Sequence, residues 1–163
     1  MSIQDLKDSQ IADNIRRYRE RGMTEGGPYS LAELLEEQAR RNPTPFEVEA
    51  VVEAIIQGSR SSIDGYVTFG DLWKNFKDEP FVGNHAQQQV GNALGRVAHY
   101  CRRNNLPYLT TLVVQSATRT ITEEARNNIF NTARELGYET GNDRDKFIDE
   151  QREKSKALAQ VAT

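Results

Sequence analysis

The sequence predicts a mainly α-helical protein with a small β element, built on a helix-turn-helix-like core with helical extensions at both ends. Three observations support this class. Apolar residues recur every three or four positions along most of the chain, which is typical of amphipathic helices. Segments rich in Gly, Pro and Asn separate these stretches. A single run, residues 108–114, is dense in β-branched and aliphatic side chains, as expected for a strand.

Two helices are expected in the first third of the chain. The first spans residues 3–21, and the Gly-Gly-Pro sequence at residues 26–28 follows its end because such a sequence cannot continue a helix. The second spans about residues 31–40. It begins at Ser30, and Glu33 stands three residues later, which is the spacing of a capping box.

The next helix is expected to begin at Thr44, with Pro45 in its first turn and Glu47 completing a capping box. Residues 58–65 are polar and turn-rich and are predicted to form a connection. The second helix should end at Asn42-Pro43, directly before Thr44. The apolar side of this third helix is expected to consist of Phe46, Val48, Val51, Val52, Ile55 and Ile56.

Two further helices should form a helix-turn-helix. Thr68 is placed to cap a helix over residues 69–76, and residues 77–84 contain Pro and Gly and should form a loop. A longer helix is predicted from about residue 86 to residue 104, with a polar outer face. Two helices joined by an irregular turn are typical of this motif. Its inward side chains are predicted to be Val90, Leu94, Val97, Ala98 and Cys101.

The last third of the chain is expected to add two helices. One begins after Thr122 and stops at Gly137, and the other runs from about residue 143 to residue 161. The last helix is highly charged, with few large apolar residues, and isolated helices of this length are marginal in water. We expect it to act as an arm or an oligomerisation element that docks through two side chains and frays at its end. Its apolar anchors are Phe147, Ile148 and Leu158.

The predicted organisation is therefore a helical extension over residues 1–43, a helix-turn-helix-like domain over residues 44–119 and C-terminal helices over residues 120–163. On this division, a chain ended after Gly141 is expected to keep residues 44–136 folded. A length of 163 residues fits one ordinary domain with extensions.

Composition and charge limit the possible functions. The chain has 21 basic and 24 acidic residues and a formal net charge of −3, and none of its three regions is basic, so nonspecific attraction to DNA phosphates should be weak. No window approaches the run of about 18 apolar residues that spans a bilayer. A lone cysteine excludes an internal disulfide and fits a reducing compartment. The N-terminal sequence lacks the features of a secretory signal. These observations predict a cytoplasmic protein with no membrane partner.

Three short phrases follow one another in a familiar order: residues 44–47 (TPFE), 67–72 (VTFGDL) and 90–93 (VGNA). In order and spacing they resemble the winged-helix DNA-binding domain of alkylguanine-DNA alkyltransferases and alkyltransferase-like proteins, over about residues 44–114. The resemblance implies a winged helix-turn-helix core. The family's reactive Pro-Cys-His-Arg is absent, since residues 108–114 contain neither cysteine nor histidine. The resemblance therefore implies the scaffold without alkyl transfer, and we expect no enzyme activity.

The resemblance also indicates which residues could contact DNA. In the family, the second helix of the motif enters the minor groove, and an arginine there helps push a base out of the stack. Gln88 stands at that arginine's position. Amide side chains can read bases or contact phosphates, and arginines contact phosphates. Gly91 allows close approach either to a DNA backbone or to a neighbouring helix, and both readings remain open. The candidate nucleic-acid-binding residues are Gln87, Gln88, Gln89, Asn92, Arg96, Arg102 and Arg103, with Lys74, Lys77 and Arg119 as further phosphate contacts.

No catalytic, metal or cofactor site is expected. His85, His99 and Cys101 are the only residues of their kinds, and His99 and Cys101 point in different directions on a helix. A structural zinc site needs about four such ligands. The chain also lacks the glycine-rich phosphate loops and the nucleophile-elbow motif. Cys101 is expected to be a buried, unreactive core residue.

Two functions follow from these patterns. The first is a non-catalytic nucleic-acid-binding protein, with DNA as the partner. The alternative is a small protein-interaction or inhibitor module, of the phage or mobile-element type, that binds a host protein. The net negative charge, the small size and the charged extensions favour the alternative. A homodimer is compatible with either.

Overall fold

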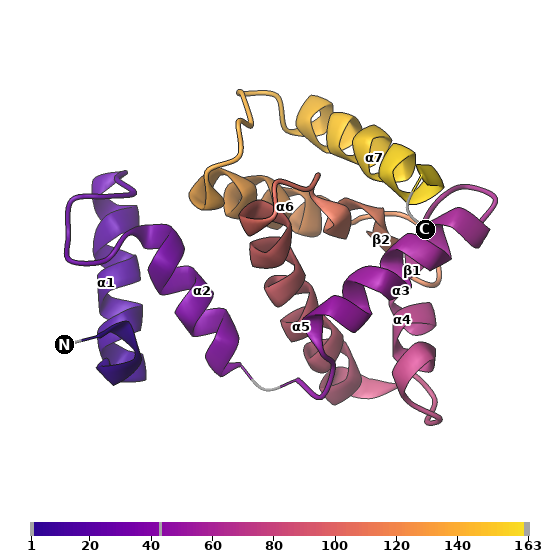
Figure 1. The fold of residues 1–163 in the computed structure, drawn as a ribbon, viewed down its shortest axis with the longest axis horizontal. Helices are drawn as coiled ribbons and strands as arrows, with labels where there is room; N and C mark the ends of the chain where they lie inside the picture. Colours follow the sequence, from indigo (N-terminus) through magenta and orange to yellow (C-terminus); the bar gives the residue numbers. More distant parts are fainter. Residues whose placement is uncertain (1, 43, 162–163) are drawn as a thin grey trace.

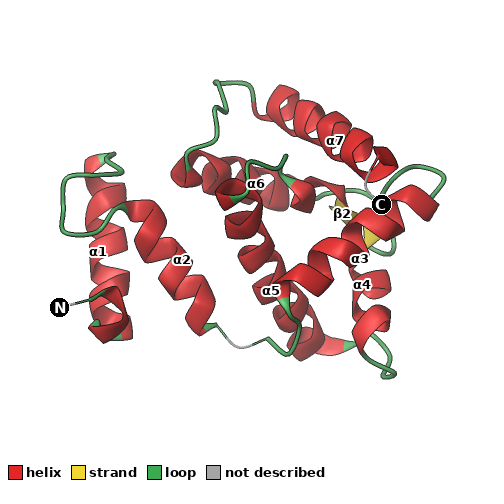
Figure 2. Ribbon diagram, viewed as in Figure 1, coloured by secondary structure: helices red, strands yellow, loops and turns green. Residues whose placement is uncertain are grey.

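The computed structural model describes residues 2–42 and 44–161. These residues form a mainly helical fold with one very small sheet, as the sequence predicts (Figures 1 and 2). Pro43, expected at the end of the second helix, lies outside the described residues. The elements are η1 (Ile3–Asp5), α1 (Asp8–Arg21), α2 (Leu31–Arg41), α3 (Val48–Ser61), β1 (Val67–Thr68), α4 (Phe69–Phe76), α5 (Gly83–Arg103), η2 (Leu109–Leu112), β2 (Val113–Val114), α6 (Glu123–Leu136) and α7 (Arg144–Val161).

Helices α1 and α2 form a hairpin at one end of the molecule (Figure 1). The hairpin has its own small apolar cluster, which is separate from the main core. The predicted capping box of α2 is confirmed: the Ser30 hydroxyl accepts a hydrogen bond from the Glu33 amide. The predicted single helix over residues 3–21 is wrong. The chain is extended at Leu6 and Lys7, and the Lys7 amide donates to the Gln10 side chain, so a new helix starts there.

Helix α3 begins and ends later than its sequence predicts. It starts at Val48 because the Thr44 hydroxyl donates to the Gln89 carbonyl of α5 instead of capping a first turn. It continues through Gly58, which was expected to open a turn. A Cβ atom at Gly58 would lie 2.8 Å from a methyl group of Val67, so the glycine lets β1 pack directly on the helix.

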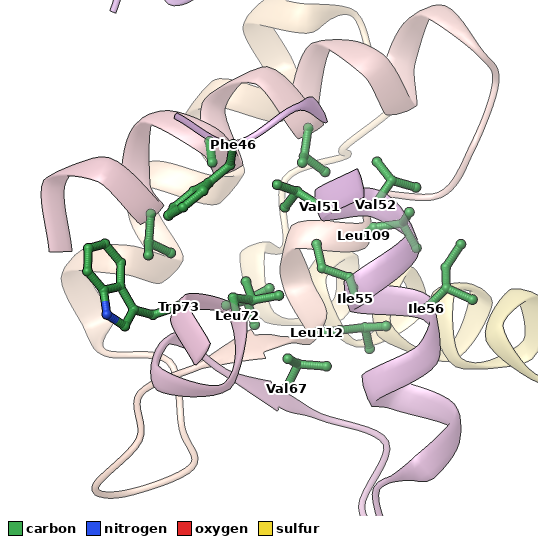
Figure 3. Close-up of a cluster of buried hydrophobic side chains, with 14 of the residues drawn as sticks. Phe46, Val51, Val52, Ile55, Ile56, Val67, Leu72, Trp73, Leu109 and Leu112 are labelled. Carbon is green, nitrogen blue, oxygen red and sulfur yellow. The ribbon is translucent and has the colours of Figure 1, made fainter. Parts of the chain in front are cut away.

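The main core is formed by α3 with α4, α5, η2 and α7 around it. Ile55 lies at its centre, facing Leu72, Leu109 and Leu112 (Figure 3). At its edge, Trp73 is buried and its indole N–H donates to the Glu79 carbonyl at 2.8 Å. The contacts of Ile55 join residues far apart in the sequence, and α5 contributes Val90 and Val97 to the same core.

The predicted strand over residues 108–114 is mostly not a strand. Residues 109–112 form the 3₁₀ helix η2, and only Val113 and Val114 pair, in parallel with Val67 and Thr68. The Thr111 amide and hydroxyl both bond to the Tyr108 carbonyl, at 3.0 and 2.8 Å, which closes a tight turn where an extended chain was expected. The segment is buried on all sides, so its apolar character reflects burial more than strand formation.

Helix α7 packs along most of its length, and the expectation of an arm held by two side chains is wrong in extent. Phe147 and Ile148 are buried as predicted, and Leu158 packs against the main core from a half-buried position. Four more residues are buried on the same helix, namely Gln151, Arg152, Ser155 and Ala159. Small and polar residues can bury a helix face when they find partners, and a search for large apolar residues misses them.

Candidate nucleic-acid interface

The four candidate amide side chains lie together on the N-terminal half of α5. Gln87 and Gln88 are exposed, whereas Gln89 and Asn92 are half-buried. The Gln89 side chain lies 2.9 Å from the ring of His85. Helix α5 begins at Gly83, about three residues before the predicted start, with a backbone φ of 85° that favours glycine. These four side chains, Gln87, Gln88, Gln89 and Asn92, are called here the amide face, and they lie on the first half of the longest described helix.

Arg96 does not join this amide face. Its guanidinium donates to the carbonyls of Ala39, Arg40 and Asn42, at 3.3, 2.9 and 2.6 Å. These carbonyls are among those left without intrahelical partners at the end of α2. Arg96 therefore caps α2 and ties the hairpin to the core.

The other two candidate arginines also make contacts within the molecule. The Arg102 guanidinium donates to the Leu136 carbonyl at the end of α6 and lies over the ring of Tyr138. Arg103 forms an ion pair with Glu36 of α2. The arginines are thus on the C-terminal half of α5, apart from the amides, and each has a structural role.

The remaining predicted cations do not make the amide face strongly basic. Arg119 forms an ion pair at 2.7 Å with Asp64, which lies in the loop between α3 and β1. This pair lowers the pKa of Asp64. Lys74 lies on α4 and Lys77 directly follows it, and the acidic side chains of Asp71, Asp78 and Glu79 lie in the same stretch of chain.

Gly91 is open to solvent. No atom lies within 4 Å of the position that a Cβ atom would occupy there, and the same is true of Gly95 one turn later. Close packing of a neighbouring helix among the described residues therefore does not explain Gly91, in contrast to Gly58. Residues four apart share a helix face, so Gln87, Gly91 and Gly95 form a line along α5.

This line leads into a pocket, called here the α5 pocket, with a volume of about 270 Å³. Helix α5 contributes Leu94, Gly95 and Ala98 to its wall, and the lining is mainly apolar. The other walls come from α4, η2, β2, the chain after β2 and α6, including Thr110, Ile121, Asn128 and Thr132.

One polar group on the wall of the α5 pocket is unsatisfied. Thr110 is 8% exposed, and its buried hydroxyl has no hydrogen-bond partner in the part of the chain that the structure describes. Burial raises the pKa of the neighbouring Tyr108, and the Thr110 side chain acts against that rise. A buried polar atom without a partner is costly, and among the described residues the Thr110 hydroxyl shares this state with side-chain groups of Arg152 and Ser155 on α7.

Only part of this pocket could be predicted from the sequence. Sequence reasoning singled out Gly91, one turn before Gly95 of the α5 wall, and the other walls come from residues between 69 and 132, which only folding brings together. The residues missed by sequence reasoning are Leu94, Gly95, Thr110, Asn128 and Thr132.

Cys101 is expected to be unreactive. Its thiol is fully buried in the main core, and burial raises its pKa to about 11, so the nucleophilic thiolate is scarce at neutral pH. Incubation with DNA containing methylated guanine should therefore leave the intact mass of the protein unchanged. A thiol reagent should label Cys101 only after denaturation, which serves as the positive control. A stoichiometric gain of one methyl group on Cys101 would contradict this expectation.

Two general features complete the description. Within residues 2–42 and 44–161, no three His, Cys, Asp or Glu side chains gather in a way that could hold a metal ion. None of the helices in these ranges is both long and apolar enough to cross a membrane.

Comparison of the chain with protein-family models, curated proteins and solved structures finds no match.

Proposed function

We propose that this protein binds nucleic acid without modifying it, through the amide face of α5 and the α5 pocket beside it. The observation that carries the proposal is the line Gln87–Gly91–Gly95, which runs from exposed amides, past an open backbone, into a pocket with an unsatisfied hydroxyl. Amides on an exposed helix can bond to bases and phosphates. A mainly apolar pocket with a few polar side chains in its walls, among them Thr110 and Asn128, is suited to a flat ring, such as an unstacked base.

The arrangement of α4 and α5 supports this proposal. Helix α4 is capped by Thr68, and residues 77–82 connect it to α5, whose N-terminal half is polar on its outer side. This is the order of a helix-turn-helix. We further propose that residues 44–119 form a core of the winged-helix kind, which rests on the resemblance to alkyltransferase-like proteins. In that family an arginine stands where this chain has Gln88.

The proposal is tested by titrating fluorescently labelled duplex and single-stranded oligonucleotides with the protein at about 50 and about 200 mM salt, because phosphate contacts weaken as salt rises. We expect binding at the lower salt, with preference for single strands or for duplexes with an unpaired base, since extruding a paired base costs free energy. Absence of binding to any probe at the lower salt would overturn the proposal.

Gly91 provides the sharpest variant. Gly91→Ala should raise the free energy of unfolding by about 0.5–1 kcal/mol, because alanine favours the helix and the added methyl group meets no atom. Gly91→Leu should remain folded but lose most of its affinity, since a bulky side chain would block close approach of the nucleic acid. Urea unfolding and the same binding titration measure the two effects.

The matched control for added bulk is Ala12→Leu, which places a similar side chain on the exposed surface of α1. It should leave affinity unchanged. Gly58→Ala should have the opposite effect on stability to Gly91→Ala, because its methyl group would collide with Val67. Full affinity in Gly91→Leu would move the binding surface away from α5.

A protein partner is the second candidate function. Val82, at the start of α5, is 74% exposed, and the acidic side chains of Asp78 and Glu79 precede it. An exposed apolar residue beside acidic ones suits a basic protein surface better than it suits DNA. Failure of every oligonucleotide to bind at low salt would favour this second function.

A further inference from the structure

A groove separates the α1–α2 hairpin from α6. It has a volume of about 510 Å³ and is called here the hairpin groove. Its α6 wall includes Asn128, Asn131 and Thr132, and two of these, Asn128 and Thr132, also line the α5 pocket. The two hollows therefore meet on the surface of α6 and form one continuous concave surface. In Figure 1, α6 lies between the hairpin and the region of α7 and β2.

The hairpin side of this surface carries cations. Arg19 lines the groove and is paired with Glu135 of α6 at 2.6 Å. A neighbouring hollow of about 260 Å³ shares Tyr18 and Met23 with the groove, and Arg17 and Arg21 line it.

Arg17 and Arg21 of α1 differ from Arg96, Arg102 and Arg103 of α5, which the sequence placed near a nucleic acid. Among the described residues, neither makes an ion pair or a hydrogen bond, and Glu25 is the one acidic side chain among those that line their hollow. Arg16 lies on the same helix, but it pairs with Asp13 and with Glu20. In a protein of net charge −3, Arg17 and Arg21 are thus cations free to meet an external anion.

We propose that a single nucleic-acid strand continues from the α5 pocket across the hairpin groove to the neighbouring hollow, where Arg17 and Arg21 contact its phosphates. This inference rests on the proposed function. It explains how a chain whose α5 arginines are engaged in structural contacts can still attract phosphates, because Arg17 and Arg21 of α1 have no ion-pair or hydrogen-bond partner among the described residues. Met23, exposed at the groove, offers an apolar surface on which a base can rest.

A single strand fits this surface better than a duplex. A base that enters the α5 pocket has left its stack, so the chain next to it is locally unpaired. The hollows beside the pocket are lined by Tyr18 and by arginines, and cations together with aromatic side chains are the usual combination for tracking one backbone. Asn128 and Asn131 of α6 are exposed on the wall of the groove and can bond to bases or sugars along the way.

The test compares three single substitutions on α1 in the full chain: Arg17→Gln, Arg21→Gln and the control Arg16→Gln. Each removes one positive charge from the same helix, but Arg16 is paired with Asp13 and Glu20 and lines neither the hairpin groove nor the hollow of Arg17 and Arg21. A labelled mixed-sequence single strand, long enough to cover both hollows, is titrated over a range of salt. About 0.7 counterion is released per phosphate contact on a single strand.

Arg17→Gln and Arg21→Gln should each lower affinity about five- to ten-fold at about 50 mM salt and reduce the slope of log affinity against log salt by about 0.7. Arg16→Gln should change neither. A strand too short to leave the α5 pocket should bind all three variants equally. Circular dichroism melting curves confirm that the exposed substitutions leave the fold intact.

The outcomes separate this inference from the proposed function. If the unchanged protein binds, and Gly91→Leu abolishes binding while Arg17→Gln and Arg21→Gln match Arg16→Gln, the groove is not part of the surface and the proposed function stands. If all three arginine variants weaken binding equally, the effect is overall charge, and the groove proposal fails. If no single strand binds at low salt, both proposals fail and a protein partner is favoured.

Discussion

A chain that ends at Gly141, and so lacks α7, is expected to lose its cooperative unfolding transition. Phe147 and Ile148 alone bury enough apolar surface to contribute about 3–6 kcal/mol, at about 1.5–3 kcal/mol for each buried side chain. Small domains have a total stability of about 5–15 kcal/mol. The deletion also exposes η2 and one side of α3, against which α7 packs. Urea unfolding followed by circular dichroism measures the effect.

Buried polar contacts of α7 add to this loss. The Arg152 guanidinium donates to the Thr111 carbonyl at 2.9 Å and lies 4.5 Å from the centre of the Tyr66 ring. The Gln151 side chain accepts a hydrogen bond from the Tyr108 amide at 2.8 Å. Without α7, these backbone groups of the η2 segment lose their partners inside the protein.

Deletion of the hairpin is the matched comparison. Its apolar cluster is separate, and it is held to the core largely by Arg96, Arg103 and Arg19. A chain that begins at Thr44 should therefore keep a cooperative transition. If the chain without α7 unfolds as cooperatively as the intact protein, residues 44–136 are an independent domain, as the sequence alone predicts.

Ile55→Ala is expected to lower the free energy of unfolding by about 2–5 kcal/mol. Ile55 is 0% exposed at the centre of the main core, and its truncation leaves a cavity among large side chains that cannot close around it (Figure 3). The same substitution at Ile63, which is 108% exposed in the loop after α3, is a control with identical chemistry. It should change stability by less than about 0.5 kcal/mol.

Equal effects at the two isoleucines, measured by urea unfolding, would mean that Ile55 is not at the centre of a packed core. The pair also bears on binding. Ile55 is a buried residue of α3 and is not part of the outer face of α5. Ile55→Ala should therefore weaken nucleic-acid binding only in proportion to the unfolded fraction of the protein. A binding loss in folded Ile55→Ala protein would indicate that core packing positions the amide face.

Helix starts and stops were predictable where the signal and its partner lie within one turn. Ser30, Thr68 and Thr122 each accept a hydrogen bond from an amide three residues later, and all three caps are found as predicted. Gly137 ends α6 in the left-handed conformation expected of a helix stop. Thr44 is the exception, because a partner 45 residues away takes its hydroxyl.

In the candidate site, too, the predictable features are those formed by residues close together in the sequence. The amide cluster on α5 was predictable because its members are neighbours in the sequence, and helical geometry places them on one end of one helix. The use of Arg96, Arg102 and Arg103 was not, since their partners belong to α2 and α6. The α5 pocket and the hairpin groove were equally inaccessible, because each has walls from several elements.

The sequence by itself determined the mainly helical class, most helix boundaries and the amide face, because all of these depend on interactions between residues close together in the chain. The tertiary structure decided what the apolar run at residues 108–114 becomes, whether α7 is an arm or part of the core, and which arginines remain available. Those outcomes depend on burial and on hydrogen-bond partners from distant segments. A carbonyl at the end of α2 can be matched with the Arg96 guanidinium only after folding brings them together.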